Sequence, residues 1–197
     1  VQSSGQRLSD SELLVKGTLS VLGTADAPVV LSSSNAVAAA GDWGGIYLEQ
    51  NADLTLTYAH LSYTGYGINS ANYIDSVKIT HSRLEFSGGG IRLNYYSSIN
   101  SLRVITDNVI SVTSGDFAIY LQQCCTEDSP SPEVSRNTIS NPQGYGIYVD
   151  NAYSGLTIDA NTIKVKSTAV QIDSSGGVIS ITGNALENTE TSSQYWN

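Results

Sequence analysis

A four-residue unit that recurs along the chain constrains the fold more than any other feature. The unit is a small residue, an apolar residue, a polar residue and a second apolar residue, as in Gly45-Ile46-Tyr47-Leu48. Its first apolar residue falls at positions 46, 68, 91, 119, 147 and 170, in steps of 22, 23, 28, 28 and 23 residues. A period of this length indicates a protein built from stacked structural repeats.

Two further units follow within each period. Residues 54–56 and 156–158 read Leu-Thr-Leu and Leu-Thr-Ile, an alternation typical of a strand with one buried face. The last unit places an asparagine two residues before an apolar residue, at Asn108, Asn137, Asn161 and Asn184. Three short strands in roughly 23 residues leave no room for crossover helices, so the sequence predicts a solenoid of parallel strands.

Stacking of the repeats makes each position a column along the solenoid, with neighbours about 4.8 Å apart. Apolar columns then form the core and polar columns form the faces. The four asparagines are predicted to form a ladder at a tight turn, where their amides bond one another and the backbone and where asparagine tolerates left-handed angles.

We expect a single domain over residues 1–197. Residues 1–40 contain shorter and less regular apolar stretches and are expected to form irregular opening coils. The two long steps of the period indicate inserts, one around residues 95–100 and one at residues 122–132 that is predicted to form a loop. The polar residues 187–197 are predicted to cap the C-terminal end of the solenoid.

The charge balance argues against nucleic acid as a partner. Eighteen Asp and Glu residues oppose nine Lys and Arg residues, for a net charge of -9, and the cations form no cluster. No apolar stretch approaches the roughly eighteen residues of a membrane span. The chain begins at Val1 and contains no Met, and with its polar composition this predicts a secreted or cell-surface protein.

The run from Gly41 to Ile46 (GDWGGI), preceded by the stretch from Gly17 to Ser33 and followed by residues 58–63 (YAHLSY), resembles the right-handed parallel β-helix repeat proteins of microbial cell surfaces. The resemblance extends over nearly the whole chain. It implies an all-β, right-handed parallel β-helix of the pectin-lyase-like type, with about seven or eight coils of roughly 23 residues. Such proteins include adhesins, structural surface proteins and carbohydrate-active enzymes, so the resemblance leaves the activity open.

Two polar columns on the first strand of each coil form the candidate ligand-binding face. Tyrosine rings beside carboxylates and amides suit a polysaccharide or surface glycan, because rings cover apolar sugar faces and planar polar groups bond hydroxyls. The alternative is that tyrosine serves only as a good strand residue. The candidate residues are Tyr47, Glu49, Asn69, Arg92, Asn94, Tyr120, Gln122, Tyr148, Asp150 and Asp173.

Asp150 and Asp173 are predicted to stack one coil apart, where two carboxylates repel each other unless a cation, a proton or solvent relieves them. A calcium site at these two residues is therefore an alternative to solvated surface charge. No other cofactor is expected.

A non-catalytic module for adhesion, carbohydrate binding or structural assembly is the expected function. The main alternative is a uronate polysaccharide lyase, whose base would come from Lys78, Arg83, Arg92 or Arg103, but these cations fall in different columns. The paired-Asp and Gly-His-Gly motifs of the pectin hydrolases with this fold are missing.

Cys124 and Cys125 are adjacent, and neighbouring Cα atoms about 3.8 Å apart are too close for an ordinary disulfide between them. An intermolecular disulfide, a strained vicinal disulfide and two reduced thiols are the alternatives. Because solenoid ends are open sheet edges, a homo-oligomer and a self-assembling filament or envelope subunit are further alternatives.

Overall fold

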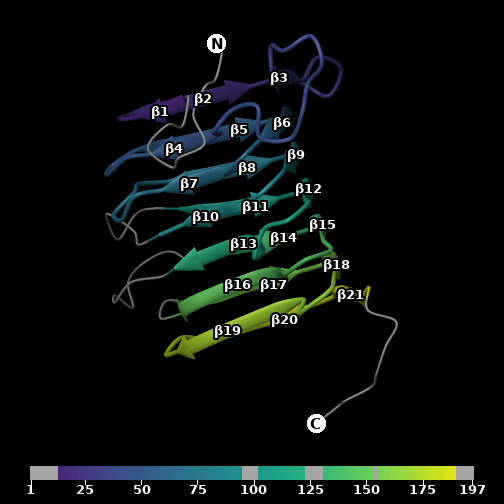
Figure 1. The fold of residues 1–197 in the computed structure, drawn as a ribbon. Coiled ribbons are helices and arrows are strands. Elements are labelled where there is room, and N and C mark those ends of the chain that lie inside the picture. The colour runs from purple at the N-terminus through teal and green to yellow at the C-terminus, as the bar shows by residue number, and fades with distance from the viewer. Residues whose placement is uncertain (1–12, 95–101, 123–130, 153–154, 190–197) are drawn as a thin grey trace.

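The computed structural model describes residues 13–94, 102–122, 131–152 and 155–189. Its twenty-one strands form three parallel sheets of seven strands each, stacked rung upon rung (Figure 1). Within the described ranges, no helix has the length and apolarity needed to span a bilayer. The prediction of an all-β parallel β-helix is confirmed.

Each coil contributes one strand to each sheet. Sheet A contains β1 (Leu13–Val15), β4 (Ile46–Leu48), β7 (Ile68–Ser70), β10 (Ile91–Leu93), β13 (Phe117–Gln122), β16 (Tyr145–Ala152) and β19 (Val170–Ser175). Sheet B contains β2 (Thr18–Leu22), β5 (Asp53–Thr57), β8 (Val77–Thr80), β11 (Arg103–Thr106), β14 (Glu133–Ser135), β17 (Leu156–Asp159) and β20 (Ile179–Thr182). Sheet C contains β3 (Val29–Leu31), β6 (Ala59–Thr64), β9 (Arg83–Phe86), β12 (Val109–Val112), β15 (Thr138–Asn141), β18 (Thr162–Val165) and β21 (Ala185–Asn188).

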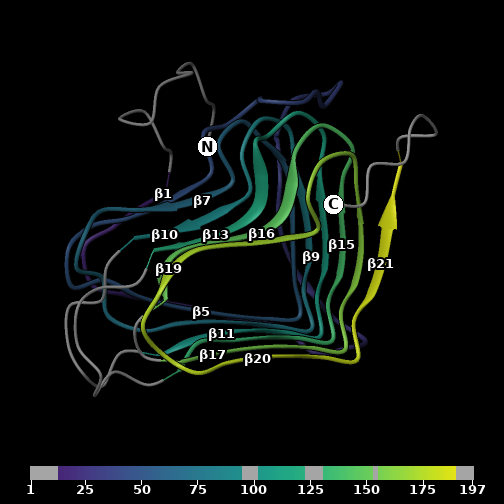
Figure 2. The ribbon, with the colours of Figure 1, turned by 90° about the horizontal axis from the view of Figure 1, so that it is seen from below.

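The predicted apolar columns form the core. Viewed along the solenoid, the three sheets form three sides of the cross-section, and their inward side chains meet between them (Figure 2). On sheet A, Ile91 pairs with Ile119 and Ile119 with Ile147, and all three side chains are fully buried. Burial of each such side chain contributes about 1.5–3 kcal/mol.

The small residue that opens each unit lies where successive coils come closest. A Cβ atom built on Gly45 would be 2.1 Å from the carbonyl oxygen of Gly67, and one built on Gly67 would be 2.3 Å from that of Gly90. Both glycines also have positive φ angles, which residues with side chains rarely adopt. The recurring small residue therefore sets how tightly the coils stack.

The predicted asparagine ladder is present at the corner between sheets B and C. The side-chain amide of Asn108 donates to Asn137 Oδ1 at 3.0 Å, and that of Asn137 donates to Asn161 Oδ1 at 3.0 Å. Asn161 continues the ladder to Asn184 at 2.9 Å. Each acceptor also receives the backbone N–H of the asparagine one coil earlier, so a buried turn has its polar groups satisfied.

The left-handed backbone expected at this corner belongs to the residue before each asparagine, which corrects the prediction. Asp107, Arg136 and Ala160 have φ angles of 60°, 56° and 52°. The asparagine itself begins the next straight segment, where its amide can reach the neighbouring coil. The corner therefore needs asparagine for its two-sided hydrogen bonding, and the preceding residue makes the turn.

Candidate functional site

The first predicted ligand-binding column forms one row across sheet A. Strand pairing places Tyr47 beside Asn69, Asn69 beside Arg92, Arg92 beside Tyr120, and Tyr120 beside Tyr148. Arg92 is exposed and the other four side chains are half-buried. The row therefore borders solvent, because alternate residues of a strand point to opposite faces.

The second column is continuous only in the C-terminal coils. Gln122 pairs with Asp150 and Asp150 with Asp173. Glu49 follows β4 directly and lies 3.8 Å from Lys16. Asn94 follows β10 and turns toward the preceding coil, where its amide donates to the Ser70 carbonyl at 2.7 Å. Asn94 therefore links two coils through its side chain.

Side-chain donors satisfy the two stacked carboxylates. Asp150 accepts hydrogen bonds from the Tyr120 hydroxyl at 3.4 Å and from Gln122 Nε2 at 3.1 Å. Asp173 accepts from the Tyr148 hydroxyl and from Gln171 Nε2, the latter at 3.1 Å. Each tyrosine thus reaches the carboxylate one coil further along, which relieves the repulsion predicted for this pair.

These contacts shift the pKa values of Tyr148 and Asp173 in opposite directions. The hydrogen bond to Asp173 is the main cause that raises the pKa of Tyr148 to about 12. The same hydrogen bond, with a smaller contribution from Gln171, holds the pKa of Asp173 below its usual value. Both groups keep their neutral-pH protonation states over a wider pH range than isolated side chains would.

Calcium at Asp150 and Asp173 stays a prediction, because two carboxylates supply only part of the oxygen ligands that calcium takes. Within the described parts of the chain, no group of three or more His, Cys, Asp or Glu side chains is arranged to hold a metal ion. Calcium usually takes six to eight oxygen ligands. The two carboxylates instead accept hydrogen bonds from tyrosine and glutamine side chains, so we draw no metal chemistry from them.

Stacking along the solenoid places a neighbour against each face of the Tyr120 ring. The Tyr120 and Tyr148 centroids are 5.4 Å apart with an interplanar angle of 12°. The Arg92 guanidinium carbon lies 5.1 Å from the Tyr120 centroid. Tyr120 therefore has an aromatic neighbour and a cation against its ring, and it offers a ligand mainly its edge and hydroxyl.

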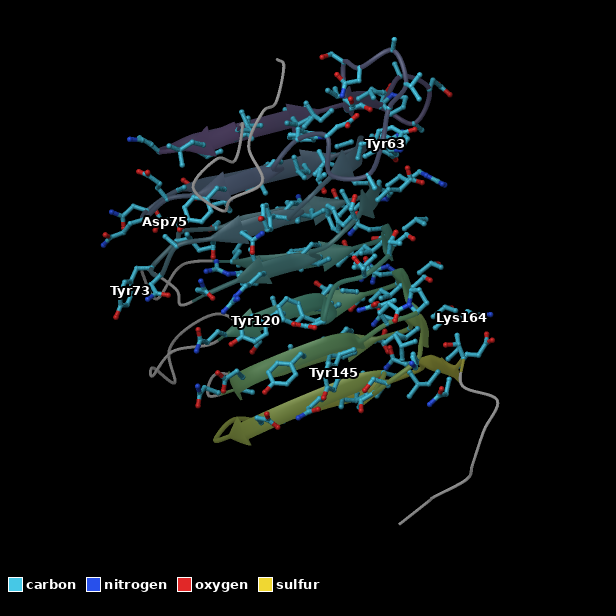
Figure 3. The ribbon with its side chains drawn as sticks, in the orientation of Figure 1. Tyr63, Tyr73, Asp75, Tyr120, Tyr145 and Lys164 are labelled. Atoms are coloured by element: carbon cyan, nitrogen blue, oxygen red, sulfur yellow. The ribbon has the colours of Figure 1, made fainter. Side chains whose placement is uncertain are left out.

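Two aromatic residues outside the predicted columns, Phe117 and Tyr145, lie beside the tyrosine row and pair across β13 and β16. Phe117 lies 5.0 Å from Tyr120, centroid to centroid, at an angle of 36°. Tyr145 meets Tyr148 edge-on, at 5.7 Å and 73°. Figure 3 shows Tyr120 and Tyr145 on neighbouring rungs of sheet A, away from Tyr63 and Tyr73.

The four rings border a cavity of about 370 Å³ at the corner where sheet C leads into sheet A. Polar residues complete the wall: Asp116, Gln143 and Ser167 are exposed and lie on three successive coils. A partly apolar hollow with a few polar groups is the usual form of a small-ligand site. We name this hollow the aromatic cavity, defined by Asp116, Phe117, Tyr120, Gln143, Gly144, Tyr145, Tyr148 and Ser167.

Strict alternation along the strand conceals Phe117 and Tyr145 in the sequence. Alternation counted back two positions from Ile119 and Ile147 predicts that the Phe117 and Tyr145 side chains point inward. In the structure two consecutive buried residues precede Tyr120 and Tyr148, so the strand bends and the earlier aromatic residue reaches the outer side. The useful signal was the repeat of an aromatic residue three positions before each of these tyrosines.

The cations proposed for a lyase lie apart. Lys78 is exposed on β8 in sheet B, whereas Arg83 on β9 in sheet C bonds Glu85 at 2.9 Å. Arg103 is only 3% exposed and donates to backbone carbonyls, including that of Leu102 at 3.1 Å. Cys124 and Cys125, the 122–132 insert except for its ends, and most of the predicted cap lie outside the described residues.

Comparison with known proteins bears on the fold. Residues 29–191, well over half of the chain, match a family model described as a right-handed β-helix region. No curated protein and no solved structure matches the chain significantly. The matched segment begins in β3 and ends just beyond β21, so it covers six complete coils of the solenoid and the last strand of the first. The chain therefore belongs to the right-handed β-helix family.

Proposed function

We propose that this β-helix is a non-catalytic, secreted or cell-surface module that binds carbohydrate on sheet A. The aromatic cavity is the observation that carries the proposal. Its aromatic rings suit the apolar faces of a sugar ring, and Asp116, Gln143 and Ser167 offer groups that can bond hydroxyls. The extracellular setting rests on the resemblance to cell-surface β-helices and on the polar composition.

The tyrosine row extends this site along the solenoid axis. Tyr120 and Tyr148 line the cavity, and Asp150 and Asp173 lie beside them with acceptor oxygens. A glycan chain could therefore occupy the cavity with one ring and cross the edges of the tyrosine row with the next. Binding along a face agrees with the shallow, elongated character of a solenoid surface.

A uronate lyase is the alternative in the enzyme class. It requires a base next to a cation that neutralises the substrate carboxylate. In the described part of the chain Arg92 is near the cavity, through its contact with Tyr120, and Arg103 is engaged by backbone carbonyls. Among the described residues Arg92 contacts an aromatic ring, which is not a base. Product analysis of a bound polymer is therefore the experiment that would detect a lyase.

Self-assembly is a second candidate, favoured by the exposed core of the last coil. Ile158 pairs with Ile181, and Ile163 with Leu186. The earlier residue of each pair is fully buried, whereas Ile181 is 49% exposed and Leu186 is 58% exposed. The described residues do not cover these apolar columns at the last coil, so another subunit can continue them.

The first experiment is a glycan array probed with the wild-type protein and with a Tyr120→Ala/Tyr148→Ala variant, with calcium and with a chelator. A Tyr73→Ala variant is the matched control, because Tyr73 is exposed and lies away from the cavity. We expect the wild type and the control to bind the same glycans and the double variant to lose at least about tenfold in affinity.

Three other results would each change the conclusion. Unsaturated sugar ends among the products of a bound polymer would establish the lyase. An array without bound glycans would reject carbohydrate binding, and concentration-dependent sedimentation of the same sample would then support assembly. Equal binding by the double variant would move the site away from the tyrosine row.

A further inference from the structure

We propose that the aromatic cavity is a subsite for one uncharged sugar ring, a hexose or an N-acetylhexosamine, and that it discriminates against uronic acids. The inference rests on the proposed function and deepens it by naming the ligand class. It depends on three features: the shape given by the rings, the charge of the lining, and the turn that holds the wall in place.

The rings form a corner instead of a flat platform. Tyr145 stands nearly perpendicular to Tyr148, and Phe117 is tilted against Tyr120. A pyranose ring that enters this corner can place its apolar face on one ring and its edge against another. A volume of about 370 Å³ is near the lower end of small-ligand sites, so it suits a single sugar ring with its substituents.

The charges around the cavity oppose a bound carboxylate. Asp116 is the one charged side chain among the lining residues, and it is exposed. Asp150 and Asp173 lie next to the cavity through their bonds to Tyr120 and Tyr148. Arg92 is the cation that contacts the ring row, through the face of Tyr120. Sugar hydroxyls can donate to these carboxylates, whereas a uronate carboxylate would be repelled by them.

Asn141 holds the turn that carries Gln143, Gly144 and Tyr145. Its fully buried side chain donates to the carbonyls of Gly115 at 3.0 Å and Tyr145 at 2.9 Å. Its oxygen accepts the backbone N–H groups of Gln143 at 3.2 Å and Gly144 at 3.1 Å. Four bonds from one amide connect two coils, so the wall is pre-organised before any ligand binds.

The backbone of the two walls is also joined directly. The N–H of Tyr145 donates to the Asp116 carbonyl at 2.7 Å, and a Cβ atom on Gly144 would be 2.1 Å from that same oxygen. The absence of a side chain at Gly144 therefore lets Asp116 and Tyr145 lie side by side. Asn141 is a positioning residue in this arrangement, because it acts on the ligand through Tyr145 and Gln143.

The test compares three soluble probes by titration calorimetry: a neutral glucan oligomer, an N-acetylglucosamine oligomer and an oligogalacturonide. The wild type is expected to bind at least one uncharged probe roughly tenfold or more tightly than the oligogalacturonide. Tyr145→Ala and Gln143→Ala should each weaken that binding, and Tyr145→Ala by about tenfold. Asp116→Asn keeps the shape of the cavity and removes its negative charge. It should therefore reduce the ratio of the affinity for the uncharged probe to the affinity for the oligogalacturonide.

Tyr73→Ala is the control for Tyr145→Ala, and Gln143→Ala guards against a folding defect because Gln143 lies outside the strands. Preference of the wild type for the oligogalacturonide would overturn the charge argument. Unchanged binding in both cavity variants, together with loss in Tyr120→Ala/Tyr148→Ala, would place the sugar on the row and reject the subsite. If the wild type binds neither the three probes nor any arrayed glycan, the proposed function itself fails.

Discussion

Two cavities lie at the same corner of the solenoid, where sheet C leads into sheet A, and both reach the turn between β12 and β13. The N-terminal one measures about 210 Å³ and is lined mostly by glycine and serine, with Trp43 and Tyr66. The C-terminal one, the aromatic cavity, measures about 370 Å³ and is lined by four aromatic rings. One repeated backbone therefore presents two different surfaces.

Trp43 is used differently from the aromatic residues that line the aromatic cavity. Trp43 is buried, and its indole N–H donates to the Ser62 carbonyl at 2.8 Å, so the ring closes the corner from inside. Phe117 and Tyr145 remain half-exposed on longer strands. The coil therefore provides the same backbone position in both halves of the solenoid. The individual side chain determines whether that position packs into the core or borders a cavity.

The largest expected effect comes from a charge placed in the core of either half. Ile147→Asp and Ile68→Asp each bury an unpaired carboxylate at a fully buried position, at an expected cost above about 4 kcal/mol. Because a repeat contacts mainly its neighbours, Ile147→Asp should remove hydrogen-exchange protection around β13 to β19, whereas Ile68→Asp should spare those strands. An unchanged thermal melting curve for either variant would contradict the column assignment.

The corner between sheets B and C offers a second comparison of the halves. Asn137 makes four ladder contacts, two through its nitrogen and two through its oxygen. Ser82 lies one coil before the ladder, and its hydroxyl makes two hydrogen bonds. It donates to the Thr80 carbonyl and accepts the Ala59 N–H. We expect Asn137→Ala to lower the free energy of unfolding by about 3 kcal/mol and Ser82→Ala by about 1.5 kcal/mol. Urea unfolding measures both, and equal losses would show that the ladder adds nothing beyond single hydrogen bonds.

A smaller effect should follow from Tyr148→Phe, which removes a hydroxyl and leaves the stacked ring. The pKa of Tyr148 is raised from 10.0 to about 12, so its bond to Asp173 stabilises the fold below pH 10 and is lost as the pH rises through about 12. The pKa of Asp173 is lowered from 3.8, so the same bond contributes fully above pH 3.8 and is lost as the pH falls through the lower value.

Alkaline absorbance titration of the wild type and Tyr148→Phe measures this contribution. The difference between the two curves should contain one tyrosine that ionises near pH 12, with circular dichroism to verify that both proteins are still folded. A difference centred near pH 10 would mean that the Tyr148 hydroxyl is not held by Asp173 in solution.

The sequence predicted the parts of the site that obey the repeat. Tyr120 and Tyr148 were placed in one row because their spacing equals the spacing of Ile119 and Ile147, and strand pairing confirms that row. Phe117 and Tyr145 were missed because a bend in the strand breaks the alternation on which the prediction depended. Asn141 was missed because its four partners are backbone groups, which sequence spacing does not identify.

The sequence by itself determined the solenoid, its columns and its asparagine ladder, because a period of about 23 residues repeats the same local preferences coil after coil and stacking reinforces them. Only the tertiary structure decided which aromatic rings come together to line the aromatic cavity. That outcome depends on the bend before Tyr120 and Tyr148, on the Asn141 turn and on contacts across coils, and these arise from packing between segments about 28 residues apart.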